Sequence, residues 1–423
     1  MARLEFIRSE PLRYEVEQGQ QGRWVAAHGE TMHRLPQLVW ADGSTWAEAN
    51  LWALEKARER NAKTIHSAMN HVLAYANWLE AEEVDWWHFP ARASERCLLR
   101  FRGNLVRTRD AGDIAPSTAS HRMAAVIRLY RWLRAMGLLT SPWPMWTERQ
   151  VGIRLTDAFG FEHTLCVTST DLAIPNRKVA GALQLEDGVM PLTLEGMRQV
   201  RRYADEHASL ELALMLRIGF ETGLRLDSIL DLKLGTLERA APDPVAGPSW
   251  YRLAVGPGAR PPVRTKGSVT GMVPIPKPLL DVLKAYATST RRLKRQALAS
   301  PGNRDLLFLT RFGNSYADPE GRAVNVEISR LRAAAVADGI EVFRNFHFHR
   351  TRATFATSLM RAALKYLEVG DAISFVREAC LHRNESTTLK YVKFIETSAA
   401  MAEASDAFSR DFLGLFGGVG HDQ

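Results

Sequence analysis

Six side chains in the second half of the 423-residue chain have the types that chemistry on a phosphodiester requires. They are Arg225, Lys266, His349, Arg352, His382 and Tyr391. An enzyme that attacks a phosphodiester without a metal ion must supply positive charge where charge grows in the transition state. Guanidinium groups stay protonated and bind two phosphate oxygens in a fixed fork. The two arginines therefore predict a phosphate-binding pair, to which the histidines would add hydrogen bonds.

The tyrosine in this set is the candidate nucleophile. A phenol with a pKa of about 10 attacks poorly at neutral pH, but beside several cations it loses its proton more readily as it attacks. Lys266 is the candidate general acid for the leaving 5′-hydroxyl group. The ester formed with Tyr391 would keep the energy of the broken bond, so that resealing would need no ATP.

Sequence spacing indicates how the chain could position these groups. Arg225 follows Thr-Gly-Leu, a glycine break between two helical stretches, where its head could project into a cleft. His349 and Arg352 have the i, i+3 spacing that places both on one face of a helix. Residues 263–274, which contain Lys266, predict a β-hairpin with a glycine-containing turn.

In order and spacing, these residues resemble the catalytic domain of the tyrosine recombinase (phage integrase) family. In that family an arginine lies in a Thr-Gly-Leu-Arg box and a lysine follows on a β-hairpin. A His-x-x-Arg motif with a Thr-Phe-Ala-Thr-like run comes next, and a second histidine precedes the nucleophilic tyrosine by nine residues. The resemblance covers roughly residues 190–400, and residues 50–140 resemble the family's core-binding domain more loosely. It implies that the six side chains are catalytic, with Tyr391 forming a 3′-phosphotyrosine intermediate.

Three positions depart from the family pattern. The third residue after Arg225 is usually acidic and is Ser228 here, although Asp227 lies next to it. Ala353 stands where histidine is common, and Leu381 stands where glycine is common. These changes leave the reacting groups intact, whereas the local geometry and the catalytic rate stay open at this point.

Each of the six residues also has a structural interpretation when it is taken alone. Tyr391 would be a half-buried core tyrosine, and His349 and His382 would be hydrogen-bonded structural groups. Lys266 would be a solvated turn lysine, and Arg225 would be a charge at a helix end. The occurrence of all six in one order is far less expected by chance than that of any single residue, which favours the catalytic interpretation.

Composition limits the other functions that the chain could have. The net charge of +8 suits a polyanionic partner but cannot name it. Cys97, Cys166 and Cys380 are scattered singly, with no C-x-x-C pair for a metal and no disulfide framework. The sequence contains no P-loop, H-E-x-x-H, G-x-S-x-G or complete dinucleotide motif. We therefore expect no metal and no cofactor.

Two further observations concern location. Residues 1–8 contain no apolar signal segment, and no run of about 18 apolar residues could span a bilayer. Single cysteines suit a reducing compartment. Together they predict a soluble, cytoplasmic protein without membrane contact.

Periodicity and composition divide the chain into five segments. We expect an N-terminal extension of unknown role, a helical core-binding domain, a linker, a catalytic domain and a C-terminal tail. Their ranges are 1–50, 51–145, 146–188, 189–400 and 401–423. The linker predicts mainly loops with two short strands, because prolines and tryptophans interrupt the helical pattern at its start.

Residues 116–139 are the clearest amphipathic helix of the first half, with Ser117 or Thr118 as the N-cap. The apolar residues that we expect to face inward are Met123, Val126, Ile127, Tyr130, Leu133 and Leu138. The candidate phosphate contacts on the other face are Arg122, Arg128, Arg131 and Arg134. The alternative is a solvated face whose aliphatic arginine stems lie on the core.

These observations favour a fold that is mainly α with a small β-sheet. The helical core-binding domain and the α+β catalytic domain would form a C-shaped clamp around double-stranded DNA. The resemblance implies a site-specific recombinase or integrase of a mobile element that works as a homo-tetramer on two DNA sites, with element-encoded accessory proteins as further partners. The apolar residues of the tail would dock into a neighbouring protomer or fold back on their own domain; they are Phe408, Phe412, Leu415 and Phe416.

Two other functions stay open at this point. A type IB topoisomerase uses a similar set of arginine, lysine, histidine and tyrosine, and would relax plasmids without a specific site. A catalytically idle DNA-binding protein could keep the fold and organise DNA ends without forming a covalent adduct.

Overall fold

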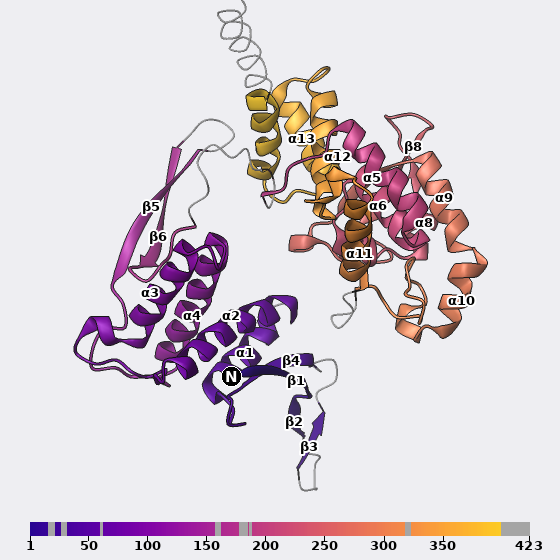
Figure 1. The fold of residues 1–423 in the computed structure, drawn as a ribbon. Coiled ribbons are helices and arrows are strands. Elements are labelled where there is room, and N and C mark those ends of the chain that lie inside the picture. Colours follow the sequence, from indigo (N-terminus) through magenta and orange to yellow (C-terminus); the bar gives the residue numbers. More distant parts are fainter. Residues whose placement is uncertain are drawn as a thin grey trace, which may run out of the picture. The chain divides into compact units, whose positions relative to one another are not determined.

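The structure is a computed structural model that describes residues 1–15, 22–26, 32–59, 62–156, 162–176, 185, 188–317 and 323–398 (Figure 1). The chain divides into two compact units, Met1–Ala180 and Gly181–Gln423. Both units are mainly helical, and their strands form small antiparallel sheets. This confirms the expected mainly α fold with small sheets. The tail at 401–423, with its four apolar residues, lies outside the described residues.

The core of the first unit is built by four helices. They are α1 (Ala47–Glu59), α2 (Ala62–Ala81), α3 (Cys97–Asp110) and α4 (Pro116–Ala135), and a 3-10 turn, Ala93–Glu95, precedes α3. Apolar side chains recur on one face of each helix and meet in a common core. Where hydroxyl groups enter this core they are hydrogen-bonded: the Tyr75 and Tyr130 oxygens lie 2.8 Å apart, and Tyr130 donates to the Trp86 carbonyl at 2.6 Å.

The bounds of α4 differ from the expected ones at both ends. Pro116 is the first helical residue and Ala115 is the N-cap without a side-chain bond, so the predicted cap at Ser117 or Thr118 is wrong. Proline suits this position because it has no N–H to leave unsatisfied and its φ is already helical. The helix ends at Ala135, and Leu138 is exposed in the following turn, where we expected it to face inward. The other five apolar residues are buried as predicted.

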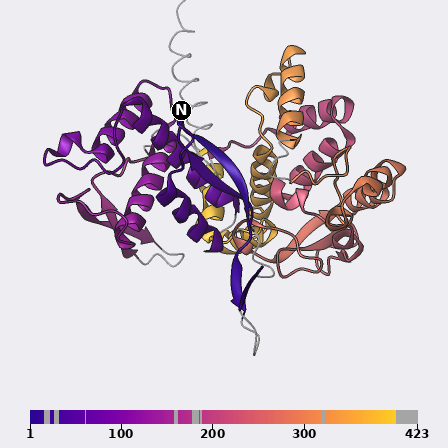
Figure 2. The same cartoon turned by 90° about the horizontal axis from the view of Figure 1, so that it is seen from below.

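Strands flank these helices in three two-stranded pairs. Their members are β1 (Arg3–Ser9) with β4 (Met32–Val39), β2 (Leu12–Glu15) with β3 (Arg23–Ala26), and β5 (Glu148–Thr156) with β6 (Glu162–Thr170). The β2–β3 ribbon extends away from the helices of its unit (Figures 1 and 2). The sequence showed no sustained period before residue 50, so the strands there escaped prediction. The described side chains of β2 and β3 are mostly exposed, and the buried residues of β4, which include Leu35, Leu38 and Val39, do not alternate regularly.

The second unit combines helices with a three-stranded sheet of order β7–β8–β9. The strands are β7 (Ala241–Pro242), β8 (Trp250–Val255) and β9 (Gly271–Pro276). The helices are α5 (Leu194–His207), α6 (Leu210–Thr222), α7 (Leu226–Leu230), α8 (Leu234–Glu238), α9 (Lys277–Ala287), α10 (Thr290–Leu298), α11 (Ala323–Ala337), α12 (His349–Ala363) and α13 (Val369–Ala379). Residues 385–398 are also helical. Nearly every side chain of α6 is buried, so this helix is the centre of the unit.

The sheet corrects the expected hairpin within residues 263–274. β9 pairs with β8, from Val255 opposite Gly271 to Trp250 opposite Pro276. Lys266 therefore lies in the long connection between the two strands, in a 3-10 turn over Lys266–Ser268. Two prolines at 261 and 262 exclude a regular strand just before this turn.

A buried carboxylate ties α6 to the end of α9 and to α10. Glu211 is fully buried, and both of its oxygens accept hydrogen bonds from Arg291 at 2.8 Å, while Arg295 lies 3.0 Å away. Tyr286 donates to it at 3.0 Å. Burial alone would raise the pKa of Glu211, but the Arg291 hydrogen bonds and the Arg295 charge outweigh burial and lower that pKa.

Glu211→Gln is expected to lower the free energy of unfolding near neutral pH by about 3 kcal/mol, because it leaves the mostly buried Arg295 without its counter-ion. The folded-state pKa is lowered, so the carboxylate stabilises the fold above its unfolded-state pKa and loses that effect as the pH falls through the folded-state value. Urea denaturation across a pH series measures both effects. Glu341→Gln, which breaks an exposed pair with Arg344, is the control and should cost less than about 1 kcal/mol. An equal cost for the two variants would contradict the prediction.

Candidate active site

The segment that carries Arg225 is shaped by the end of α6. Gly223 caps this helix with a φ of 67°, a left-handed conformation that favours glycine. A Cβ atom at Gly223 would also lie 2.4 Å from the Phe355 ring of α12. Arg225 follows in extended conformation as the N-cap of α7. It thus stands between two helices, as the sequence predicts, with its side chain partly buried.

Helix α12 carries His349 and Arg352 one turn apart, as predicted, and packs against α6 and α13 (Figure 1). Close approach to α6 depends on Gly219, where a Cβ atom would meet the Thr351 hydroxyl at 2.4 Å. His349 is the first residue of α12 and is partly buried. α12 therefore fixes His349 and Arg352 relative to the end of α6.

Arg352 joins two segments of the site. Its side chain is buried, and its Nη1 donates to the Gly223 carbonyl at 2.6 Å. Its Nη2 donates to the Cys380 carbonyl at 2.7 Å. One guanidinium therefore holds together the backbone that leads to Arg225 and the backbone that leads to His382.

His382 and Tyr391 are direct neighbours. Their rings stack with centroids 6.0 Å apart and planes 13° from parallel. His382 is 5% exposed and Tyr391 is fully buried. The Nδ1 atom of His382 lies 2.9 Å from the hydroxyl oxygen of Thr388, which belongs to the same helical segment as Tyr391. The nine-residue spacing thus places the histidine and tyrosine rings near each other in nearly parallel planes.

Leu381 shows how the chain accommodates one departure from the family pattern. Its φ is 52°, the left-handed region in which glycine is favoured, and its side chain is nevertheless buried. Space for it comes from Gly271, where a Cβ atom would lie 2.6 Å from the leucine Cδ2. The other two departures, Ser228 and Ala353, are both buried.

The turn that carries Lys266 is anchored to Asp231 through Arg264 and is bridged by a hydrogen bond between Thr265 and Val269. Asp231 accepts a hydrogen bond from the Arg264 backbone N–H at 2.7 Å and pairs with the Arg264 guanidinium at 3.3 Å. Thr265 donates to the Val269 carbonyl at 2.7 Å. A Cβ atom at Gly267 would lie 3.7 Å from the Arg383 side chain, so the exposed Lys266 turn lies beside the segment that follows His382.

A hollow of about 400 Å³ adjoins this cluster. β9 and the connection before it line one side, and the end of α13 with His382 lines the other. Its charged groups are mixed: Asp243 is hydrogen-bonded to Arg252 at 2.6 Å, which holds the pKa of this carboxyl well below its ordinary value, and Arg377 and Glu378 also line it. His382 therefore borders this hollow on one side and does not contact the hydrophobic core there.

The four arginines of α4 do not form one uniform surface. Arg134 lies over the Trp146 ring at 5.4 Å, and Arg131 lies 3.9 Å from Glu148. Arg128 is exposed, and Arg122 is partly buried. Arg131 and Arg134 therefore already interact with side chains of their own unit, in addition to their predicted role as phosphate contacts.

A basic hollow of about 770 Å³ lies between α1, α2 and α4 and includes two of these arginines. The cationic or titratable residues that line it are Lys56, Lys63, His71, His121, Arg128 and Arg131. Sequence reasoning missed the lysines and histidines because they come from three helices whose packing local periodicity does not predict. The only sequence signal was a basic residue on each of these helices.

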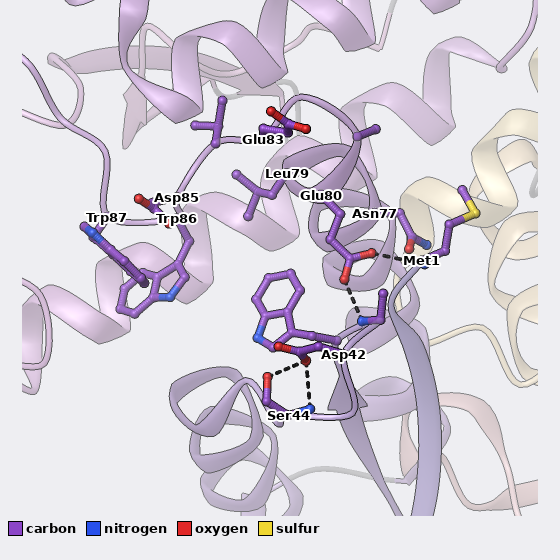
Figure 3. Close-up of a pocket in the computed structure, with 14 residues that line it drawn as sticks. Met1, Asp42, Ser44, Asn77, Leu79, Glu80, Glu83, Asp85, Trp86 and Trp87 are labelled. Carbon is purple, nitrogen blue, oxygen red and sulfur yellow. Dashed lines mark hydrogen bonds and ion pairs between the residues drawn. The ribbon is translucent and has the colours of Figure 1, made fainter.

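A second hollow of the first unit has the opposite character (Figure 3). It measures about 660 Å³, and its labelled acidic residues are Asp42, Glu80, Glu83 and Asp85, beside Trp86 and Trp87. Glu80 accepts from the Ala41 N–H at 2.7 Å and pairs with the Met1 amino group at 3.4 Å. Carboxylates repel phosphate, so this hollow is not part of a candidate DNA-binding surface.

The described residues contain neither a metal-binding cluster nor a membrane-spanning helix. Within the ranges given above, no three His, Cys, Asp or Glu side chains are grouped so that they could hold a metal ion. Among the helices of these ranges, none is long and apolar enough to cross a membrane.

Comparison with known proteins identifies the class to which this site belongs. Residues 192–396 match the model of the phage integrase family, and they include all six candidate residues. This match confirms, over these residues, the resemblance to the phage integrase (tyrosine recombinase) family seen in the sequence. A search of curated proteins finds no match.

Several solved structures are similar to this chain. The Tn1549 transposon integrase, residues 82–397 with circular intermediate DNA, is 15% identical with a TM-score of 0.45, covering 81% of this chain and 94% of that one. A lambda integrase dimer bound to a COC′ core site is 13% identical with a TM-score of 0.47, covering 82% and 76%. XerA recombinase is 14% identical with a TM-score of 0.34, covering 82% and 95%. Likeness at this level assigns no activity to the chain.

Proposed function

We propose that the protein is a site-specific DNA recombinase or integrase that cleaves and rejoins DNA strands through a 3′-phosphotyrosine bond to Tyr391. The observation that carries the proposal is the pair of hydrogen bonds from Arg352 to the Gly223 and Cys380 carbonyls. They join the segment of Arg225 to the segment of His382, whose ring stacks on Tyr391. Three separate stretches of sequence are thereby joined, those of Arg225, of Arg352 and of His382 with Tyr391, which supports a common phosphodiester site.

Each residue has a role that follows from its chemistry. Arg225 and Arg352 bind the non-bridging oxygens of the phosphate and stabilise the charge of the pentavalent transition state. His349 and His382 donate hydrogen bonds to the same oxygens. The Tyr391 oxygen forms the new bond to phosphorus as the bond to the 5′-oxygen breaks.

Lys266 acts on the leaving group. Its ammonium group gives a proton to the 5′-oxygen as that oxygen leaves, and takes the proton back when the strand is rejoined. An exposed lysine on a turn beside the His382 segment suits this role, because it can reach a strand that lies over the site. Neither ATP nor a metal ion enters the scheme.

The basic hollow of the first unit is the proposed DNA-binding surface there. Cationic groups from three helices suit the phosphates of double-stranded DNA, and affinity should fall steeply with salt. We propose that the first unit acts as the core-binding domain, that the second acts as the catalytic domain, and that the two clamp one duplex. A homo-tetramer on two DNA sites and a role in moving a mobile element belong to the same proposal.

Covalent trapping tests this function. The protein is incubated with nicked suicide substrates that carry the candidate element ends, and denaturing gels detect the protein–DNA adduct. The expected result is an adduct whose nucleotide-bearing peptide contains Tyr391. No adduct on authentic ends would favour the catalytically idle DNA-binding protein, and relaxation of plasmids by a monomer without any specific site would favour a type IB topoisomerase.

DNA binding in the basic hollow is expected to strengthen as the pH falls. Burial lowers the pKa of His71, and the charges of His121, Arg122 and Arg128 lower it further. A bound phosphate would raise that pKa again, so binding takes up a proton and affinity rises by about 3- to 10-fold from pH 8 to pH 6 at constant ionic strength. Fluorescence anisotropy measures this change.

The variant His71→Gln should reduce this pH dependence. The exposed His88, which does not line the hollow, provides the matched control His88→Gln, which should retain the wild-type dependence. The same pH dependence in His71→Gln as in the wild type would refute the assignment.

A further inference from the structure

Thr388 has a buried hydroxyl whose partner is a side chain of the candidate active site. The residue is fully buried, and its oxygen lies 2.9 Å from Nδ1 of His382. A buried hydroxyl costs stability unless it is hydrogen-bonded, whereas valine fills the same volume without that cost. The hydroxyl at this position therefore needs an explanation other than packing.

Two residues of the helical segment 385–398 contact the imidazole ring of His382, one at its plane and one at its edge. Thr388 and Tyr391 are at i and i+3, so they share one face of this helix. Tyr391 stacks on the plane of the imidazole, which limits tilting of the ring, and Thr388 binds its edge, which limits rotation within that plane. Moving the helix would carry the tyrosine and the partner of the histidine together.

We propose that Thr388 is a positioning residue that sets the orientation and the tautomer of His382 in the strand-cleavage reaction, an inference that rests on the function proposed above. With Nδ1 facing Thr388, Nε2 is the ring atom that acts on a phosphate oxygen in the proposed reaction. When the hydroxyl donates to Nδ1, Nε2 carries the proton and is a hydrogen-bond donor, as the role of His382 requires.

A hydroxyl also suits the charged form of the ring. If His382 becomes an imidazolium as charge grows on the phosphate, the same oxygen accepts from Nδ1–H after its own proton rotates away. Thr388 can thus keep its bond to His382 in either protonation state, whereas a valine could bind neither. Loss of the hydroxyl would let the ring rotate or take the wrong tautomer.

The test compares single-turnover rates of covalent adduct formation at saturating protein, with DNA affinity measured separately. Thr388→Val, which keeps the shape and removes the hydroxyl, should lower the rate by about 10- to 100-fold without changing affinity, by analogy with the loss of groups that orient metal-ligating histidines. Thr388→Ser should stay within about 3-fold of wild type, because it restores the hydroxyl. Thr387→Val, the same change at the neighbouring position, is the control and should keep the wild-type rate.

A double-mutant cycle separates positioning from packing. If Thr388 acts through His382, then adding Thr388→Val to His382→Ala should cause no further loss of rate. The inference would be overturned if Thr388→Val lowered the rate equally in the wild-type and His382→Ala backgrounds. It would also be overturned if Thr388→Val stayed within about 2-fold of the wild-type rate while His382→Ala was strongly impaired. Adduct formation by the wild-type protein tests the proposed function itself. If the wild type forms no adduct, both proposals fail. If the wild type forms adduct and Thr388→Val is unaffected, only the role of Thr388 fails.

Discussion

Tyr391→Phe is expected to abolish the covalent protein–DNA adduct, with a loss of at least about 10⁴-fold in strand cleavage. The change removes one oxygen atom, which is the atom that would bond to phosphorus. The ring remains, so its burial and its stacking on His382 should be kept. The variant should therefore fold and bind DNA with wild-type affinity. Suicide-substrate trapping on denaturing gels, together with a gel-shift titration, measures both properties.

A matched control separates the nucleophile from tyrosines in general. Tyr366 is 86% exposed and lies just after α12, so Tyr366→Phe should form adduct at the wild-type level. An adduct that persists in Tyr391→Phe, with the nucleotide mapped to another residue, would show that Tyr391 has been misassigned.

Arg352→Lys is expected to lower both strand cleavage and stability, although it keeps the positive charge. A lysine ammonium cannot reproduce the planar fork that donates to the Gly223 and Cys380 carbonyls while facing a phosphate. Loss of a charge-stabilising donor in the transition state should slow cleavage by about 10²- to 10³-fold. A buried carbonyl left without its donor should lower the free energy of unfolding by about 1 to 3 kcal/mol.

The two effects are measured apart, with single-turnover cleavage at a temperature well below the melting transition and urea denaturation for stability. Arg361→Lys is the control, because Arg361 lies in the last turn of the same helix and is exposed. It should leave both quantities unchanged. Wild-type cleavage by Arg352→Lys would exclude a bidentate role for this arginine.

The sequence predicted the parts of the site that depend on local pattern. His349 and Arg352 share a helix face, Arg225 follows a glycine cap between two helices, and nine residues separate a histidine from a tyrosine that the structure stacks together. Each of these follows from helix geometry or from the special conformation of glycine. The family model matches residues 192–396, the range in which these motifs lie.

What the sequence could not predict depends on contacts between distant segments. The strand partner of β9 is β8 and not the residues before Lys266, because pairing register is chosen by the whole sheet and not by the turn alone. The two carbonyls that bind Arg352 are backbone atoms, which no residue pattern marks. The lysines and histidines of the basic hollow become neighbours only when three helices pack.

The burial of Tyr391 has a consequence for when the protein can react. A hydroxyl with no exposed surface cannot meet a phosphodiester, so in the proposed function the structure described here is a resting state. Uncovering an aromatic side chain costs on the order of 2 kcal/mol in lost apolar contact, and in the proposed function DNA bound elsewhere on the protein would supply this energy. Such a coupling would make strand breakage conditional on a fully engaged substrate and protect other DNA from accidental nicking by an unassembled protomer.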